Sequence, residues 1–270
     1  MKNRREVAPN PYLDLTREFN AGRLRAILSS GQAVVLHRLA VMSKDGDWIV
    51  REEEESLAQI RGALARRGAR YRFGAPLDVR WLRGGWSSHL ELDADGLRIR
   101  TDFVSRPPRI SAERLAAIWK EEESAEIPFV SAADLARIKM TRREKDWAVI
   151  GELARRLDDV RDQLLFSRSA RDLERLGAVN PELVAELVSE RPLLGELDRG
   201  RDALEAALDA ERRSLMRADE LRLRKYADAS KTWAERWRSA QRELEGLSLE
   251  HAHARMVGWA DGVLPFEPEV

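Results

Sequence analysis

The composition of this chain changes near residue 150, and that change restricts the possible folds more than any other feature of the sequence. Glycine, proline and β-branched residues concentrate before that point, whereas long stretches rich in Ala, Leu, Glu and Arg follow it. The first part therefore predicts an α+β structure, and the second predicts helices that pack as a bundle. We expect two domains, residues 1–155 and 156–270, because 270 residues suit one large domain or two ordinary ones.

Hydrophobic periodicity indicates the elements of the first part. Apolar residues at helical spacing predict a helix over residues 52–67, and Trp48 to Val50 has the composition of a strand. Between residues 69 and 104 apolar and polar residues alternate, with Asp95-Gly96 as a hairpin turn signal. The strands expected in this stretch cover residues 71–73, 77–81, 89–92 and 97–104, and helices are expected at 111–119 and 131–155.

Composition also excludes several classes of site. The chain has no cysteine, which excludes disulfides, thiolate nucleophiles and Cys-ligated metal centres. The 47 basic and 47 acidic residues cancel, so any polyanion would have to bind a local patch. The amino-terminal residues lack the apolar stretch of a secretion signal, and no uncharged run approaches the roughly 20 residues that span a bilayer. We therefore expect a cytoplasmic protein with no membrane partner.

Three acidic residues form the most informative constellation. Asp45 and Asp47 precede Trp48, and residues two apart in a strand point to the same face, so their carboxylates would lie side by side. Such a pair suits Mg²⁺ or Mn²⁺, which prefer oxygen ligands and bind substrate phosphates. Asp102 lies in a later predicted strand, and as a neighbour it would complete a two-metal site. Asp78 competes with Asp102 as third acid, and Asp-Gly-Asp is also common in turns.

The order of these residues resembles the polymerase-β-type nucleotidyltransferase superfamily, in particular its minimal and toxin-type members. Ser30-Gly31-Gln32-Ala33 stands where that family often has Gly-Gly-x-Ala, and Ser43-Lys44-Asp45-Gly46-Asp47 stands where it often has Thr-x-Asp-x-Asp. The segment from Asp134 to Asp146, which contains Lys139, resembles the helix after the third acid in those proteins. The similarity covers residues 20–155, and it implies a small mixed β-sheet flanked by helices, followed by the helical part.

The resemblance implies an enzyme that transfers a nucleoside monophosphate from a nucleoside triphosphate to a hydroxyl acceptor. Asp45, Asp47 and Asp102 would be the catalytic and metal-binding residues, with Mg²⁺ or Mn²⁺ as cofactor. The residues expected to bind the nucleotide are Ser30, Gly31, Gln32, Lys44, Lys139 and Arg143. The acceptor class stays open between tRNA, a protein side chain and a small hydroxylated molecule, so toxin–antitoxin and antibiotic-modifying types are both implied.

Two departures from the family pattern favour a second hypothesis. Ser30 replaces the first glycine of the turn, and Gly46 stands between the two acids where an apolar residue is usual. These changes are also expected in a catalytically degenerate protein that keeps the nucleotidyltransferase scaffold and binds a protein partner through its helical part. Metal-dependent nucleotide binding separates the two hypotheses.

Overall fold

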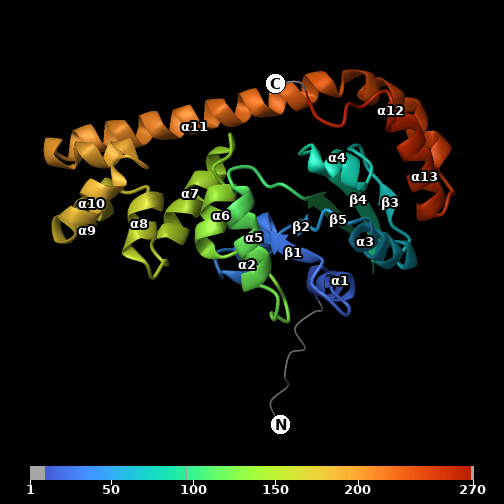
Figure 1. The fold of residues 1–270 in the computed structure, drawn as a ribbon, viewed down its shortest axis with the longest axis horizontal. Helices are drawn as coiled ribbons and strands as arrows, with labels where there is room; N and C mark the ends of the chain where they lie inside the picture. The colour runs from blue at the N-terminus through green and yellow to red at the C-terminus, as the bar shows by residue number, and fades with distance from the viewer. Residues whose placement is uncertain (1–9, 95, 269–270) are drawn as a thin grey trace, which may run out of the picture.

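The sheet explains how the acidic residues are brought together. The computed structural model describes residues 10–94 and 96–268 (Figure 1). Among these residues, five strands form one mixed sheet in the order β1-β2-β5-β4-β3. β2 and β5 run parallel, whereas the other neighbouring strands are antiparallel. The strands are β1 (Ala26–Ser29), β2 (Asp45–Val50), β3 (Arg70–Tyr71), β4 (Ser88–Ala94) and β5 (Leu97–Val104).

Helices flank this sheet and continue after it, which confirms the predicted α+β class. No described helix is both long enough and apolar enough to cross a membrane. The helices up to residue 154 are α1 (Pro11–Phe19), α2 (Ser30–Leu36), α3 (Glu54–Arg66), α4 (Val79–Arg83), α5 (Ala112–Glu121), α6 (Ala132–Ile138) and α7 (Glu144–Ala154). Those that follow are α8 (Val160–Phe166), α9 (Ala170–Val179), α10 (Pro181–Leu187), the 3-10 helix η1 (Pro192–Arg199), α11 (Arg201–Ala229), α12 (Lys231–Leu244) and α13 (Leu249–Ala260).

One face of the sheet carries an aromatic core. Trp48 stacks on Phe103 with ring centroids 5.5 Å apart, and Phe19 from α1 packs edge-on against both rings. Trp48 Nε1 donates a hydrogen bond of 2.9 Å to Thr16 Oγ1, which satisfies the buried indole. The sequence patterns above do not predict α1, although Asn10 caps it and Pro11 occupies its first turn. Helix α1 therefore packs against the face of β2 that is opposite to the acids.

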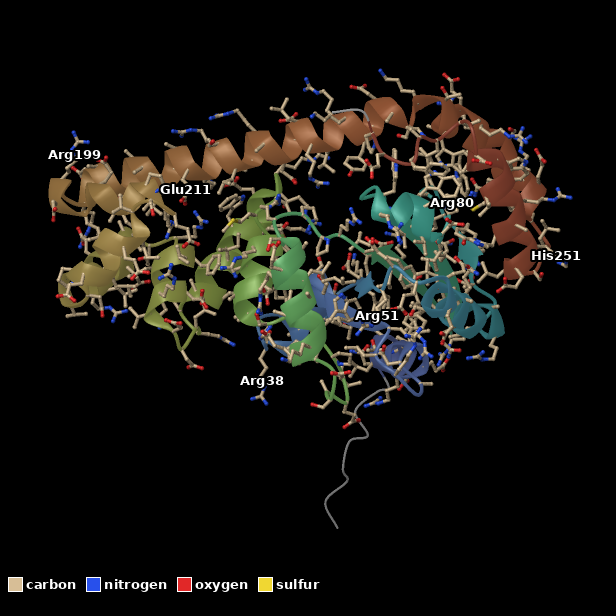
Figure 2. The ribbon with its side chains drawn as sticks, in the orientation of Figure 1. Arg38, Arg51, Arg80, Arg199, Glu211 and His251 are labelled. Carbon is tan, nitrogen blue, oxygen red and sulfur yellow. The ribbon has the colours of Figure 1, made fainter. Side chains whose placement is uncertain are left out.

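The long helix α11 connects two groups of helices. It runs along one side of the molecule from α9 and α10 to α12 and α13 (Figure 1). Figure 2 shows Glu211, on α11, and His251, on α13, toward opposite ends of the molecule. Trp233 and Trp237 of α12 are buried in the core that also contains Trp48. The last helices thus pack against the sheet region, while the domain division at residues 155 and 156 stays a prediction.

Two of the expected elements are wrong. Residues 77–81 do not form a strand, because the Asp78 carboxylate accepts a hydrogen bond from the Arg80 amide and begins α4. The helix expected over 131–155 is interrupted between α6 and α7, where Thr141 and Arg143 bond to Asp146. In the predicted hairpin turn, Asp95 lies outside the described residues.

Candidate active site

The parallel pairing of β2 with β5 places the three predicted acids on one face of the sheet. Asp47 lies directly opposite Asp102 in the register, and Asp45 lies opposite Arg100. Because side chains alternate along a strand, Asp45, Asp47 and Asp102 point to the same side, away from Trp48 and Phe103. The structure therefore brings together the carboxylates on which the functional hypothesis depends, while their roles stay predictions.

Among these three acids, Asp47 is the one whose pKa is raised. Burial, followed by the charge of Asp102 and a smaller effect of Asp45, raises the pKa of Asp47 to about 6. The Gly31 backbone amide and Lys139 act in the opposite direction and partly stabilise the ionised form. Tyr12, across the strand, has its pKa raised to about 12 by burial and then by Asp45 and Asp47. Asp47 is therefore the acid of this cluster whose ionised form is disfavoured.

The two carboxylates of β2 fit a hard divalent cation. Asp45 Oδ1 is buried and has no hydrogen-bond partner, although Arg100 Nη1 lies 3.8 Å away. A bound cation would satisfy this oxygen, and its charge would offset the burial and the repulsion that raise the pKa of Asp47. In residues 10–94 and 96–268, however, no three Asp, Glu or His side chains are close enough to hold a metal as they stand. Asp102 would have to move or rotate to join the other two.

Asp102 is instead held by two residues that the sequence analysis did not identify. His89 Nδ1 lies 2.7 Å from Asp102 Oδ1, and Arg72 Nη1 donates to the same oxygen at 3.3 Å. Ser87 Oγ lies 2.9 Å from His89 Nε2, so that Ser87, His89 and Asp102 form one hydrogen-bonded chain. The predicted hairpin turn at residues 95 and 96 could have identified His89 from the sequence. Two strands that pair on either side of this turn place His89 opposite Asp102.

The turn before α2 has an unusual backbone. Ser30 adopts a left-handed conformation with φ +47°, which is uncommon for a residue other than glycine. This is the position at which the family that the sequence resembles often has glycine. A Cβ at Gly31 would lie 2.2 Å from Ser43 Oγ, which shows how closely the turn approaches the segment before β2. The backbone of Gly31 is therefore next to the acids.

Gln32 and Lys44 occupy different environments. The Gln32 side chain is buried, and its Nε2 donates to the carbonyls of Ser43 and Asp45 at 3.3 Å. It braces the start of β2 and does not point freely into solvent. Lys44 has an exposed side chain, whereas its carbonyl accepts a hydrogen bond of 2.7 Å from the Tyr12 hydroxyl. Of these two residues, Lys44 is therefore the one with a side chain that is accessible to a nucleotide.

Lys139 lies at the end of α6 in a buried ion pair. Its Nζ donates to Asp146 Oδ1 at 3.2 Å, and both side chains are nearly inaccessible to solvent. Arg143 is half-exposed and donates to Asp146 Oδ2 at 2.8 Å. The charge of Lys139 lowers the pKa of Asp47, so it acts on the acids although its ammonium group is paired with Asp146. The predicted nucleotide contacts of Lys139 and Arg143 stay predictions.

We expect Lys139→Met to raise the pKa of Asp47 above its value of about 6, because the substitution removes a positive charge that favours the carboxylate. Methionine keeps an unbranched apolar side chain in the buried position. A carboxyl titration followed by nuclear magnetic resonance measures the change, and Lys120→Met, at an exposed site on α5, is the matched control. An Asp47 pKa that stays the same or falls would contradict the coupling.

Asp78, the other candidate for the third acid, does not lie on the sheet. Asp78 caps α4, outside the sheet, and both of its carboxylate oxygens pair with Arg80. Asp78 thus forms a local ion pair with Arg80, and the strand expected over residues 77–81 is absent. Of the two candidates, only Asp102 lies on the strand that adjoins β2.

Two cavities lie beside the acid-bearing strands. One of about 660 Å³ adjoins the start of β2, and its lining includes Tyr12, Gln32, Lys44 and Arg100. The other, of about 620 Å³, lies between β3 and the segment from α12 to α13, and its lining includes Arg72. The first cavity thus contains Arg100, which lies near Asp45, and the second contains Arg72, which bonds to Asp102, but neither lining includes one of the three acids. Each cavity is large enough for a small molecule.

Comparison with known proteins gives limited information. No protein-family model and no curated protein matches the chain. Among solved structures, the chain is similar to a crystal structure from H. pylori of a protein provisionally described as a nucleotidyltransferase. The match has a TM-score of 0.38 and 12% sequence identity, and it covers 76% of this chain and 94% of the other.

Proposed function

We propose that the protein is a metal-dependent nucleotidyltransferase. The observation that carries this proposal is the placement of Asp45, Asp47 and Asp102 on one face of two adjoining parallel strands. The left-handed turn at Ser30 lies beside them, and the buried Asp45 oxygen without a hydrogen-bond partner suits a cation ligand. In the proposed reaction, an acceptor hydroxyl attacks the α-phosphate of a nucleoside triphosphate in line, and pyrophosphate leaves.

The chain supplies the positions and charges for this reaction. Asp45 and Asp47 would hold Mg²⁺ or Mn²⁺, with Asp102 as the third ligand, and the bound cation would neutralise phosphate charge. The Ser30-Gly31 turn would approach the triphosphate with its backbone amides, since it lies against the segment that leads into β2. Lys44 and Arg143 have accessible side chains, and both would add positive charge around the phosphates.

The acceptor is proposed only as a hydroxyl compound. The cavity lined by Lys44 and Arg100 adjoins Asp45 and would hold part of the nucleotide or of the acceptor. A tRNA end, a protein side chain and a small molecule such as an aminoglycoside all present suitable hydroxyls. A toxin–antitoxin role belongs to the same proposal, and the genes that neighbour this one would test it.

Nucleotide binding measured by calorimetry tests the proposal. We expect a nucleoside triphosphate to bind in the presence of Mg²⁺, and Asp45→Ala to lose that binding. Asp93→Ala is the matched control, because Asp93 is an exposed acid that pairs with Arg70 on the same face of the sheet. Absence of metal-dependent binding in the native protein would contradict the proposal.

The raised pKa of Asp47 predicts a pH dependence of metal affinity. The ionised carboxylate is the form that binds a cation, and below about pH 6 an increasing fraction of Asp47 is protonated. We therefore expect the affinity for Mn²⁺ to fall as the pH decreases through about 6. Calorimetric titrations between pH 5 and 8 measure this, and an affinity that does not change across this range would contradict a role for Asp47.

A catalytically degenerate interaction protein is the second candidate. The observation that favours it is the engagement of two expected site residues with other side chains. Asp102 Oδ1 is held by His89 and Arg72, and Lys139 is paired with Asp146. This candidate predicts no metal-dependent nucleotide binding, so the calorimetric experiment separates it from the enzyme.

A further inference from the structure

The hydrogen-bonded chain from Ser87 to Asp102 has a defined direction. A carboxylate can only accept hydrogen bonds, so His89 Nδ1 must carry the hydrogen that is shared with Asp102 Oδ1 at 2.7 Å. In the neutral imidazole Nε2 is then an acceptor, and Ser87 Oγ, 2.9 Å away, donates to it. This is the arrangement in which a histidine removes the proton of a nucleophilic hydroxyl while a carboxylate orients the ring.

Backbone hydrogen bonds hold both Ser87 and His89 in place. The Ala75 amide donates to the Ser87 carbonyl at 3.1 Å, and the Arg72 amide donates to the His89 carbonyl at 2.9 Å. Gly74 lies over the imidazole, because a Cβ there would be only 2.6 Å from His89 Cδ2. Gly74 thus limits the space in which the ring can move, and the orientation needed for proton removal is already formed.

Ser87 and His89 also line a cavity of their own. It has a volume of about 200 Å³, and its lining includes Gly85 and, from α11, Arg222 and Tyr226. Arg222 has a buried Nε without a hydrogen-bond partner, although one of its terminal nitrogens donates to Asp219. The Arg222 side chain lines the same cavity as the hydroxyl–imidazole pair, and a guanidinium favours an anionic group, such as a phosphate.

Asp102 links this cavity to the proposed nucleotide site. Its Oδ1 accepts from His89 and Arg72, whereas Oδ2 accepts no hydrogen bond from the described part of the chain. Oδ1 therefore orients His89, while Asp102 is also the residue that lies opposite Asp47 in the strand register. The serine hydroxyl is two hydrogen bonds away from the acid cluster.

We propose that Ser87 is a nucleophile toward phosphorus and accepts the nucleotidyl group of a bound nucleoside triphosphate, so that the chain modifies itself. This proposal rests on the proposed function, and it names a hydroxyl of the chain as an acceptor. A bond forms between Ser87 Oγ and the α-phosphorus, while the bond from that phosphorus to the oxygen bridging toward the β-phosphate breaks. Pyrophosphate leaves, and the hydroxyl proton passes to His89 Nε2.

Labelling with nucleoside triphosphates tests this step. The full-length protein is incubated with Mg²⁺ and each nucleoside triphosphate labelled at the α-phosphate, and peptides are then analysed by mass spectrometry. We expect a nucleotidyl group on Ser87, no label in Ser87→Ala, and at least about a hundredfold slower labelling in His89→Gln, since general-base catalysis contributes about 10²–10⁴-fold. Ser230→Ala, which alters another serine of the same cavity, should retain the label.

A fluorophosphonate probe tests the nucleophile without any nucleotide. Attack of Ser87 Oγ on its phosphorus expels fluoride, and the reaction should disappear in Ser87→Ala and in His89→Gln. A Ser87 that does not react with the probe would overturn the activated nucleophile. A protein that binds nucleotide by calorimetry but carries no label on Ser87 would overturn the self-modification and leave the proposed function standing. Absence of metal-dependent nucleotide binding, by contrast, would overturn the proposed function itself.

Discussion

Replacement of Asp47 by asparagine is expected to lower the rate of nucleotidyl transfer by about a hundredfold or more and to leave the fold intact. Mutation of a residue that only orients a metal ligand already lowers metal affinity or activity by about 10–100-fold. Loss of a direct anionic ligand should lower the rate at least as much. Asn has nearly the same shape as Asp and can occupy the same half-buried position. The measurement is the transfer of an α-labelled nucleotide, with Asp93→Asn as the matched control on the same sheet face.

The same variant is expected to change the pH dependence of stability. The pKa of Asp47 is about 6 in the folded protein, above its ordinary value of 3.8, so the folded state holds this proton more tightly than the unfolded state. Ionisation of Asp47 therefore reduces the free energy of unfolding as the pH rises from about 4 to about 6. Asp47→Asn removes this loss and should be more stable than the native protein above pH 6. A variant that retains more than about one hundredth of the native rate, or is less stable at pH 7, would contradict the account.

Gly46→Ala is expected to reduce the free energy of unfolding by about 1–3 kcal/mol, because it overpacks the aromatic core. A Cβ at Gly46 would lie 2.5 Å from both the Trp48 and the Tyr12 rings, and Trp48 is fully buried. Neither ring can shift freely, since Trp48 also stacks on Phe103 and Tyr12 begins a helix. Chemical denaturation measures the difference.

Gly62→Ala is the control for this prediction. Gly62 lies within α3, and a Cβ there would meet only the terminal Nη1 of Arg66 at 3.7 Å. Alanine should raise the free energy of unfolding by about 0.5–1 kcal/mol at this helical position. If Gly46→Ala stabilises the protein as Gly62→Ala does, the explanation of Gly46 by packing is wrong.

Gly46 shows why part of the site could not be predicted from the sequence. As a departure from the family pattern, this glycine favoured a degenerate protein, but in the structure it allows the Tyr12 ring to approach β2. The contact joins residues 34 positions apart, on a helix that the hydrophobic pattern did not indicate. Such long-range packing leaves no periodic signal along the chain, whereas the local alternation that predicted β5 is a direct consequence of burial on one face.

The acids themselves could be placed because their positions follow from strand geometry. Side chains two apart share a face, so Asp45 and Asp47 were expected together, and β5 lies beside β2 in the sheet. His89 could have been placed opposite Asp102 from the hairpin turn, since the register follows from the turn position. Asp78 shows the opposite case, because a local bond to the Arg80 amide overrides an alternating pattern.

The central claim is tested most directly by incubation of the protein with a cell extract, Mg²⁺ and each nucleoside triphosphate labelled at the α-phosphate. The account predicts that a hydroxyl-bearing acceptor becomes labelled, that label requires the metal, and that Asp47→Asn reduces it by about a hundredfold or more. Release of pyrophosphate should accompany the labelling. If no nucleoside triphosphate labels any component above the level found with Asp47→Asn, the protein is not the nucleotidyltransferase that its acid cluster indicates.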